Sequence, residues 1–81
     1  MSSTLGSARH EAIWTFLIKK RNKAGLSQYE VARRLGRWQS YVARVESGQR
    51  RLDLVELMAF ADALGFDIRE LVRHVAKAPA Q

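Results

Sequence analysis

Three side chains with hydrogen-bonding groups lie close together near the middle of the chain: Gln39, Ser40 and Arg44. A glutamine carboxamide can pair with adenine at two atoms, an arginine guanidinium can pair with guanine at two atoms, and a serine hydroxyl can donate or accept. On the exposed face of one helix, these groups would suit the floor of a DNA major groove. The residues around them must therefore build such a helix and turn that face outward.

Residues 28–47 have the composition of two short helices that cross. Helices that meet at roughly 90–120° over a turn of three to four residues need a very small side chain where their backbones approach. Ala32 fits that place and Gly36 fits the turn, while Val31 and Leu35 would meet the apolar residues of the second helix. The helix-turn-helix packing is predicted to involve Ala32, Gly36, Val42 and Val45. The outward face of the second helix would then carry Gln39, Ser40, Ala43, Arg44 and Ser47.

Glycines and capping residues predict where the helices begin and end. Four glycines follow apolar residues at helical spacing, where a residue with positive φ ends a helix: Gly25, Gly36, Gly48 and Gly65. Three segments place a side-chain acceptor at the N-cap and glutamate three residues later, which is the capping-box pattern: they start at Ser27, Asp53 and Asp67. The predicted helices span 8–23, 28–35, 39–47, 54–64 and 68–76, so the expected fold is an all-α, five-helix bundle.

Apolar residues fall on one stripe of each predicted helix and predict the core. Trp14, Phe16 and Ile18 add apolar area to the first helix, where we expect them to widen the core, with an oligomer contact as the alternative. The predicted stripes are Ile13, Leu17, Val31, Ala32, Leu35, Val42, Val45, Leu54, Leu57, Met58, Ala61, Leu64, Ile68, Leu71, Val72 and Val75.

Length and composition predict one small globular domain. The chain has 81 residues, of which 47% are apolar and 27% charged, and it contains no cysteine. This excludes a disulfide framework, a thiolate zinc site and a cysteine nucleophile, and fits a reducing compartment such as the cytoplasm. The longest apolar run, 57–61, is far shorter than the roughly 20 residues of a membrane span. We expect a domain over 8–76, with flexible tails at 1–7 and 77–81 and no separate effector-binding domain.

The positive charge is unevenly distributed. The net charge is +6, and residues 1–52 carry the whole excess of Lys and Arg, whereas residues 53–81 are net negative. Clustered cations of this kind indicate a polyanionic partner: nucleic acid, anionic lipid or an acidic protein. A merely solvated basic surface is the alternative.

Over about residues 13–72, the sequence resembles the XRE or phage Cro/repressor class of helix-turn-helix DNA-binding proteins. The resemblance implies a lambda-repressor-like domain in which helix 39–47 enters the major groove and helix 28–35 lies across the DNA backbone. The matching residues are Arg21, Gly25 to Gln28, Val31, Ala32, Leu35, Gly36, Gln39, Ser40, Val42, Val45, Glu46, Gly48, Ala63 to Gly65, Glu70 and Leu71.

The resemblance also implies roles for individual residues. Gln39 and Ser40 would read bases, with Arg44 as a third reader one turn later. Gln28 would contact phosphate and brace the first reader. The ion pair Arg21–Glu46 would tie the first helix to the third. The residues expected at the DNA backbone are Gln28, Tyr41, Arg50, Arg51 and Lys23.

Several of these assignments have a structural alternative. Tyr41 could reach a phosphate or pack against the turn, and Lys23, like Lys19 and Lys20, would supply diffuse attraction only. Arg33 and Arg34 are interpreted as structural, because cations suit the C-terminus of a helix. Trp38 departs from the family, which has a side-chain cap at this place; we expect its indole to pack, with DNA stacking or a dimer contact as alternatives. Lys20 is a second departure, at a position that is commonly apolar.

Motifs of enzymes are missing from the sequence. It has no P-loop, no dinucleotide-binding glycines and no nucleophile elbow. His10 and His74 lack partners at the spacing of a metal site. We therefore expect no catalysis, no metal and no cofactor.

One recognition helix reads too few base pairs to select a site in a genome, so we expect a homodimer on an inverted repeat of double-stranded DNA. The interface is predicted at helix 68–76 with Phe66 and the tail, or at the junction of the last two helices. The leading hypothesis is a cytoplasmic, nucleoid-associated transcriptional repressor. The alternatives are an antitoxin that masks a partner toxin, and a non-specific binder of RNA or lipid.

Overall fold

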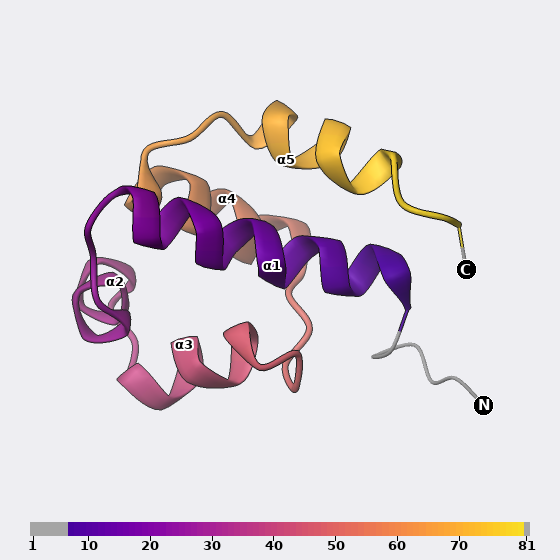
Figure 1. Cartoon of the computed structure of the whole chain (residues 1–81). Helices are drawn as coiled ribbons and strands as arrows, with labels where there is room; N and C mark the ends of the chain where they lie inside the picture. The colour runs from indigo at the N-terminus through magenta and orange to yellow at the C-terminus, as the bar shows by residue number, and fades with distance from the viewer. Residues whose placement is uncertain (1–6, 81) are drawn as a thin grey trace.

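The computed structural model describes residues 7–80, whose regular elements are five α-helices (Figure 1). The long helix α1 passes through the middle of the molecule, with α5 along one side of it and α2 and α3 on the other (Figure 1). The predicted all-α, five-helix fold is confirmed. The helices are α1 (Ala8–Lys23), α2 (Gln28–Leu35), α3 (Gln39–Glu46), α4 (Leu54–Leu64) and α5 (Ile68–Ala76).

The helix boundaries match the prediction except at the end of α3. This helix ends at Glu46, and Ser47 is its C-cap with φ −89° and ψ 0°, so it is not helical. All four glycines that were expected to end helices have positive φ: Gly25, Gly36, Gly48 and Gly65. Short-range signals in the sequence therefore locate the helix ends to within one residue.

Two of the three predicted capping boxes are present, and the third is wrong. The side chains of Ser27 and Asp53 each accept a hydrogen bond from the backbone N–H of the glutamate three residues later. The side chain of that glutamate accepts in turn from the backbone N–H of the N-cap residue. At α5, Asp67 accepts from the N–H of Arg69 instead. Hydrogen bonds from Arg69 lower the pKa of the Asp67 carboxyl to about 2. The expected box partner, Glu70, pairs with Lys20 at 2.8 Å, which also explains the cation at this unusual position.

The core confirms most of the predicted stripes but corrects α4. Phe60, absent from the prediction, is 1% exposed, whereas Leu54 and Met58 are 61% and 49% exposed. All residues of α4 except Glu56 and Asp62 are apolar, so periodicity alone cannot fix which side of this helix faces inward. Val72 on α5 is likewise exposed, and Phe16 is buried. The buried apolar residues are Phe16, Leu17, Val31, Ala32, Val42, Val45, Phe60, Ala61, Leu64 and Leu71.

The ends of the described chain are attached to the bundle. Ser7, predicted as part of a tail, caps α1 by accepting from the N–H of His10, and is itself buried. Arg9 donates to the carbonyl oxygen of Ala78 at 3.2 Å. The remaining residues of the predicted N-terminal tail, 1–6, and the last residue, 81, lie outside the described part. None of the described helices has the length and apolarity that crossing a membrane requires.

Candidate nucleic-acid interface

The crossing of α2 and α3 holds one face of α3 toward solvent. Ala32, Val42 and Val45 are almost completely buried between the helices, with exposed fractions of 2% or less. On the opposite side of α3, Gln39, Ser40, Arg44 and Ser47 are all exposed. The structure thus brings the three predicted base readers together on one accessible face at the edge of the molecule.

The N-terminus of α3 has no side-chain cap. Trp38 occupies the N-cap position without a capping hydrogen bond, and its side chain is 84% exposed. The expectation that this indole packs in the protein is therefore wrong, because the ring lies in solvent. A large apolar ring and uncapped backbone N–H groups lie instead beside Gln39.

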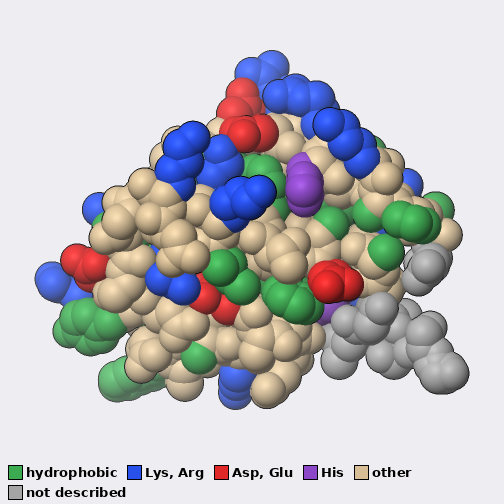
Figure 2. Space-filling view, in the orientation of Figure 1, with side chains coloured by type: hydrophobic (Ala, Val, Ile, Leu, Met, Phe, Trp, Pro, Cys, Tyr) green, Lys and Arg blue, Asp and Glu red, His purple; other side chains and the backbone are tan. Residues whose placement is uncertain are grey.

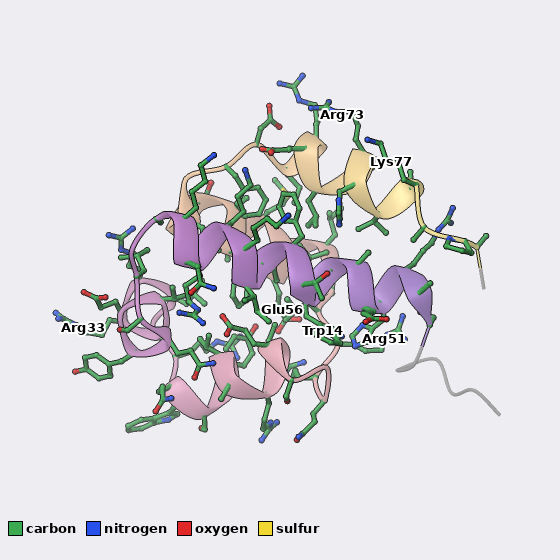
Figure 3. All side chains as sticks on the ribbon, viewed as in Figure 1. Trp14, Arg33, Arg51, Glu56, Arg73 and Lys77 are labelled. Atoms are coloured by element: carbon green, nitrogen blue, oxygen red, sulfur yellow. The ribbon has the colours of Figure 1, made fainter. Side chains whose placement is uncertain are left out.

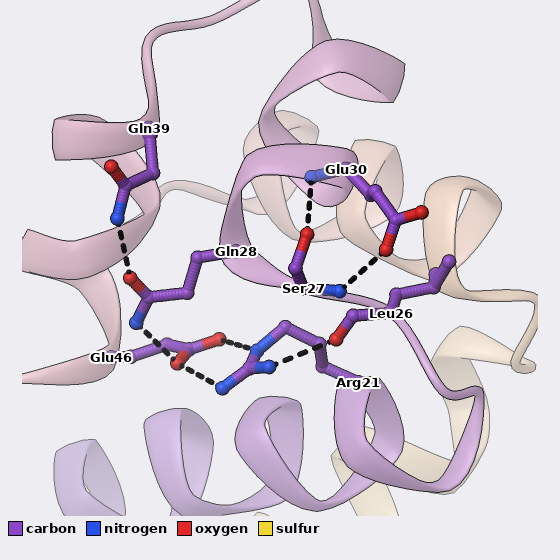
Figure 4. Close-up of polar contacts among 7 residues, drawn as sticks. All are labelled: Arg21, Leu26, Ser27, Gln28, Glu30, Gln39 and Glu46. Atoms are coloured by element: carbon purple, nitrogen blue, oxygen red, sulfur yellow. Dashed lines mark hydrogen bonds and ion pairs between the residues drawn. The ribbon is translucent and has the colours of Figure 1, made fainter.

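A chain of hydrogen bonds connects α1, α2 and α3 (Figure 4). Arg21 donates from Nε to Glu46 Oε2 at 2.7 Å and from Nη2 to Oε1 at 3.0 Å, so this ion pair is present as the resemblance implies. Gln28 Nε2 donates to the same Oε1 at 2.9 Å. Gln39 Nε2 donates to Gln28 Oε1 at 3.0 Å. The first predicted base reader is thus linked to a nearly buried ion pair through Gln28.

Glu56 on α4 forms a second polar centre, which the sequence reveals only as a capping residue. Its Oε2 accepts from Arg50 Nη2 at 2.8 Å and from the Tyr41 hydroxyl at 3.2 Å, and lies 3.8 Å from Arg37 Nη2. Both guanidinium groups also lie over the Tyr41 ring, at 4.4 Å for Arg37 and 5.1 Å for Arg50. Tyr41 therefore packs in the protein, with its hydroxyl engaged.

The charges around Tyr41 favour its neutral, donating form. Burial and then the nearby Glu56 carboxylate raise the pKa of the Tyr41 phenol, although the two arginines act in the opposite direction. The phenol stays protonated at neutral pH, so that it donates to Glu56. Glu56 thereby holds the guanidinium of Arg50, in the loop after α3, beside the Tyr41 ring.

The basic side chains are not confined to the α3 side of the molecule. Lys19, Lys20 and Lys23 line a hollow between α1 and α5, together with Glu70 and His74. Figure 2 shows most of the visible Lys and Arg side chains over the upper part of the molecule, around α1 and α5, with isolated ones at the left and lower edges. The cations that cluster in residues 1–52 of the sequence therefore do not form one continuous face, and Lys23 lines the hollow between α1 and α5. Arg34 donates to the Ala63 carbonyl oxygen at 2.8 Å, which is a structural contact.

The loop after α3 is fastened to α1 at Gly48. His10 Nε2 lies 3.1 Å from the Gly48 carbonyl oxygen, in a side chain that is only 4% exposed. The Trp14 ring covers the other side of this residue: a Cβ at Gly48 would lie 2.8 Å from Trp14 Nε1. Figure 3 labels Trp14 on α1 and Arg51 in the loop that follows Gly48. These contacts fix the segment that carries Arg50 and Arg51.

Gly48→Ala is expected to lower the free energy of unfolding by about 2–3 kcal/mol, because it adds a steric clash to an unfavourable φ of +81°. Gly25→Ala is the matched control: its φ is +74°, but nothing lies within 4 Å of the added Cβ. It should cost only about 1 kcal/mol, from the backbone alone. Denaturant unfolding of both variants measures the difference. Equal losses would contradict the role of the Trp14 contact.

Comparisons with known proteins agree with this geometry. A family model described as helix-turn-helix matches residues 17–71. An XRE-family like protein from Pseudomonas syringae pv. tomato str. DC3000 superimposes with a TM-score of 0.80 at 40% identity, over 85% of this chain and 84% of that one. None of the curated protein sequences matches the chain.

Two restriction-modification controller proteins are also similar. C.AhdI from Aeromonas hydrophila is 39% identical, with a TM-score of 0.71 over 76% of this chain and 94% of that one. C.Esp1396I, solved as a tetramer in complex with its natural 35 base-pair operator, has a TM-score of 0.73 over 94% of this chain and 100% of that one. At 19% identity, this second likeness concerns the fold alone.

Proposed function

The chain belongs to the XRE family of helix-turn-helix DNA-binding proteins, and we propose that it is a transcriptional regulator that binds a specific double-stranded DNA site through α3. The observation that carries this proposal is the exposed row of Gln39, Ser40 and Arg44 on a helix whose other face is buried against α2. Each of these side chains can hydrogen-bond to base edges in the major groove. Regulators of restriction-modification systems among the similar structures support the same class of function.

Backbone contacts would orient α3 in the groove. Arg50 and Arg51 follow α3 in the loop fastened at Gly48, and Gln28 lies at the start of α2. Salt bridges and hydrogen bonds to phosphates fix register without reading sequence. We assign Arg50, Arg51 and Gln28 to this role, with Tyr41 holding the loop arginines and Lys23 adding long-range attraction.

Gln39→Ala should reduce the preference for one base at a single position of the site, by roughly 1–3 kcal/mol, because it removes a base contact. Arg51→Ala should instead weaken binding to all sequences by a similar factor, because phosphate contacts carry no sequence information. Selection from a random duplex pool, followed by titration of single-base variants of the selected site, measures both effects. An unchanged base preference in Gln39→Ala would contradict the assignment of the reader.

The salt dependence of binding separates specific from purely electrostatic association. Logarithmic affinity should fall with logarithmic salt concentration by about 0.9 per phosphate contacted, and Arg51→Ala should reduce that slope by about one. Binding to the selected site should also persist in excess competitor DNA. Complete loss to competitor would favour a non-specific polyanion binder.

We further propose that the protein binds DNA as a homodimer on an inverted repeat. An apolar groove lies where α4 and α5 meet the start of α1, and Leu54 and Val72 at its rim are 61% and 57% exposed. A second copy that covers this groove would bury Leu54 and Val72 and double the number of base contacts. The groove is lined by Arg9, Ile13, Leu54, Leu57, Ile68, Leu71, Val72, Val75 and Ala76.

The direction of regulation that we propose is repression, with a bound dimer blocking access to its DNA site. Placing the selected site over the promoter of a reporter gene should lower expression when the protein is supplied. Increased expression would contradict repression while leaving DNA binding intact. The antitoxin alternative would instead place a toxin on the same apolar groove, in which case a dimer would be dispensable for function.

A further inference from the structure

The carboxamide of Gln39 has two chemically opposite ends, and which end faces outward decides which base it can read. Its Nε2 is held by Gln28 Oε1 at 3.0 Å. Among residues 7–80 this is the only hydrogen bond of the Gln39 side chain, so Oε1 and the second N–H remain available to a base. Adenine presents one donor and one acceptor in the major groove, whereas guanine presents two acceptors. An outward Oε1 therefore matches adenine.

The orientation of Gln39 is set one step further back, by Gln28. Each end of the Gln28 carboxamide has one partner in the protein: Nε2 donates to Glu46 Oε1, and Oε1 accepts from Gln39 (Figure 4). If Gln39 turned over, its Oε1 would face the Oε1 of Gln28. To keep a hydrogen bond between the two side chains Gln28 would have to turn over as well, so the hydrogen-bonded pair of amides can reverse only together.

Glu46 prevents this reversal, because an ionised carboxylate accepts hydrogen bonds and cannot donate them. It is nearly buried, with 7% of its side chain exposed, and Arg21 binds both of its oxygens. A reversed Gln28 would direct a carbonyl oxygen at this carboxylate and lose a charge-assisted hydrogen bond. The polarity of the chain from Glu46 to Gln39 is thus fixed by chemistry.

We propose that Glu46, held by Arg21 and acting through Gln28, is a positioning residue that makes Gln39 select adenine and reject guanine. This inference rests on the proposed function, in which Gln39 reads a base. It gives the ion pair a role in specificity beyond tying α1 to α3. A correctly oriented bidentate contact discriminates roughly 5- to 150-fold between bases, and this discrimination is what Glu46 would protect.

The main test is the double variant Arg21→Met/Glu46→Met. It removes both charges together and keeps similar side-chain volumes, a replacement that folded proteins often tolerate well. Without the acceptor at position 46, Gln28 and Gln39 can reverse, and Gln39 can offer two donors to guanine. We expect the ratio of affinities for adenine over guanine, at the position read by Gln39, to fall about fivefold or more. An unchanged ratio in the folded double variant would overturn the proposal.

A second variant covers the case in which the double variant does not fold. Gln28→Met leaves the ion pair in place and breaks the connection to Gln39, so it should lower the same ratio. Phe16→Leu is the control for stability, since this core residue on α1 packs against Phe66 and His74 and lies outside the hydrogen-bonded chain. It reduces the folded fraction and should weaken both duplexes equally. A ratio that falls in Phe16→Leu as well would contradict the mechanism.

The outcome with Gln39→Ala distinguishes a failure of the proposed base contact from a failure of the proposed role of Glu46. That variant first identifies the base position concerned, using duplexes that differ only there. If it changes preference at no position, the proposed reader is wrong. If it changes preference at one position but both Arg21→Met/Glu46→Met and Gln28→Met keep the wild-type ratio there, Gln39 reads a base and the role of Glu46 is wrong.

Discussion

Arg21→Met alone should lower the free energy of unfolding by about 3 kcal/mol, because it leaves the Glu46 carboxylate buried without its cation. The side chains of this pair are 16% and 7% exposed, so water can replace the lost hydrogen bonds only in part. The interaction is mutual: the hydrogen bond with Glu46 raises the pKa of the Arg21 guanidinium. The expected loss of about 3 kcal/mol lies at the lower end of the range for buried ion pairs, because the Arg21 side chain is still partly exposed to solvent.

A loss of this size is a large part of the stability of a domain this small, for which about 4–12 kcal/mol is typical. The melting temperature should fall by about 10 °C or more. Arg69→Met is the matched control, since it removes an ion pair of the same 2.7 Å length whose side chains are 79% and 48% exposed. Exposed pairs contribute little, so that variant should melt close to the wild type. Similar melting temperatures for Arg21→Met and Arg69→Met would contradict the importance of burial.

The comparison of Arg21→Met with Arg21→Met/Glu46→Met separates stability from specificity. The second substitution removes the orphaned charge, so it should recover most of the lost stability. According to the inference above, it should at the same time lower the preference for adenine. A variant that is more stable and less specific than its parent cannot be explained by partial unfolding.

Local sequence signals predicted the helices well because caps and left-handed glycines act within a few residues. Ser27 and Asp53 satisfy N–H groups in their own helices, and the crossing of α2 and α3 follows from one small residue, Ala32, which is 2% exposed. The third box failed for a tertiary reason. Glu70 pairs with Lys20, fifty residues earlier in the chain, and no local sequence pattern predicts that ion pair.

The candidate site was predictable in its residue types but not in its connections. The exposed face of α3 followed from periodicity once Val42 and Val45 were assigned to the core. In contrast, the roles of Glu56 and His10 depend on contacts with side chains and carbonyl groups from other elements. The spacing of residues in the sequence does not determine the side-chain rotamers that make those contacts. Trp38 shows the limit most clearly: its apolar character favoured packing, but the turn that it occupies points it into solvent.

The apolar groove between α4 and α5 is the surface at which we propose that two copies of the chain meet. Val72→Glu should abolish the proposed dimer, because it places a charge on the rim that the second copy would cover. Linking two binding modules raises affinity by about 10²–10⁴, so affinity for a two-half-site operator should fall at least about 100-fold. Affinity for a single half-site should stay nearly the same, since α3 is untouched. Sedimentation and titrations of both duplexes measure these quantities.

The matched control is Ala59→Glu, which introduces the same charge on α4 at an exposed position outside the groove. It should retain the dimer and most of the affinity for the operator, so that any general effect of added negative charge on DNA binding is measured separately. Val72 is exposed in the single chain, and its replacement should leave the melting temperature of the monomer nearly unchanged. If Val72→Glu still sediments as a dimer, or if Ala59→Glu weakens operator binding equally, the groove between α4 and α5 is not where two copies meet.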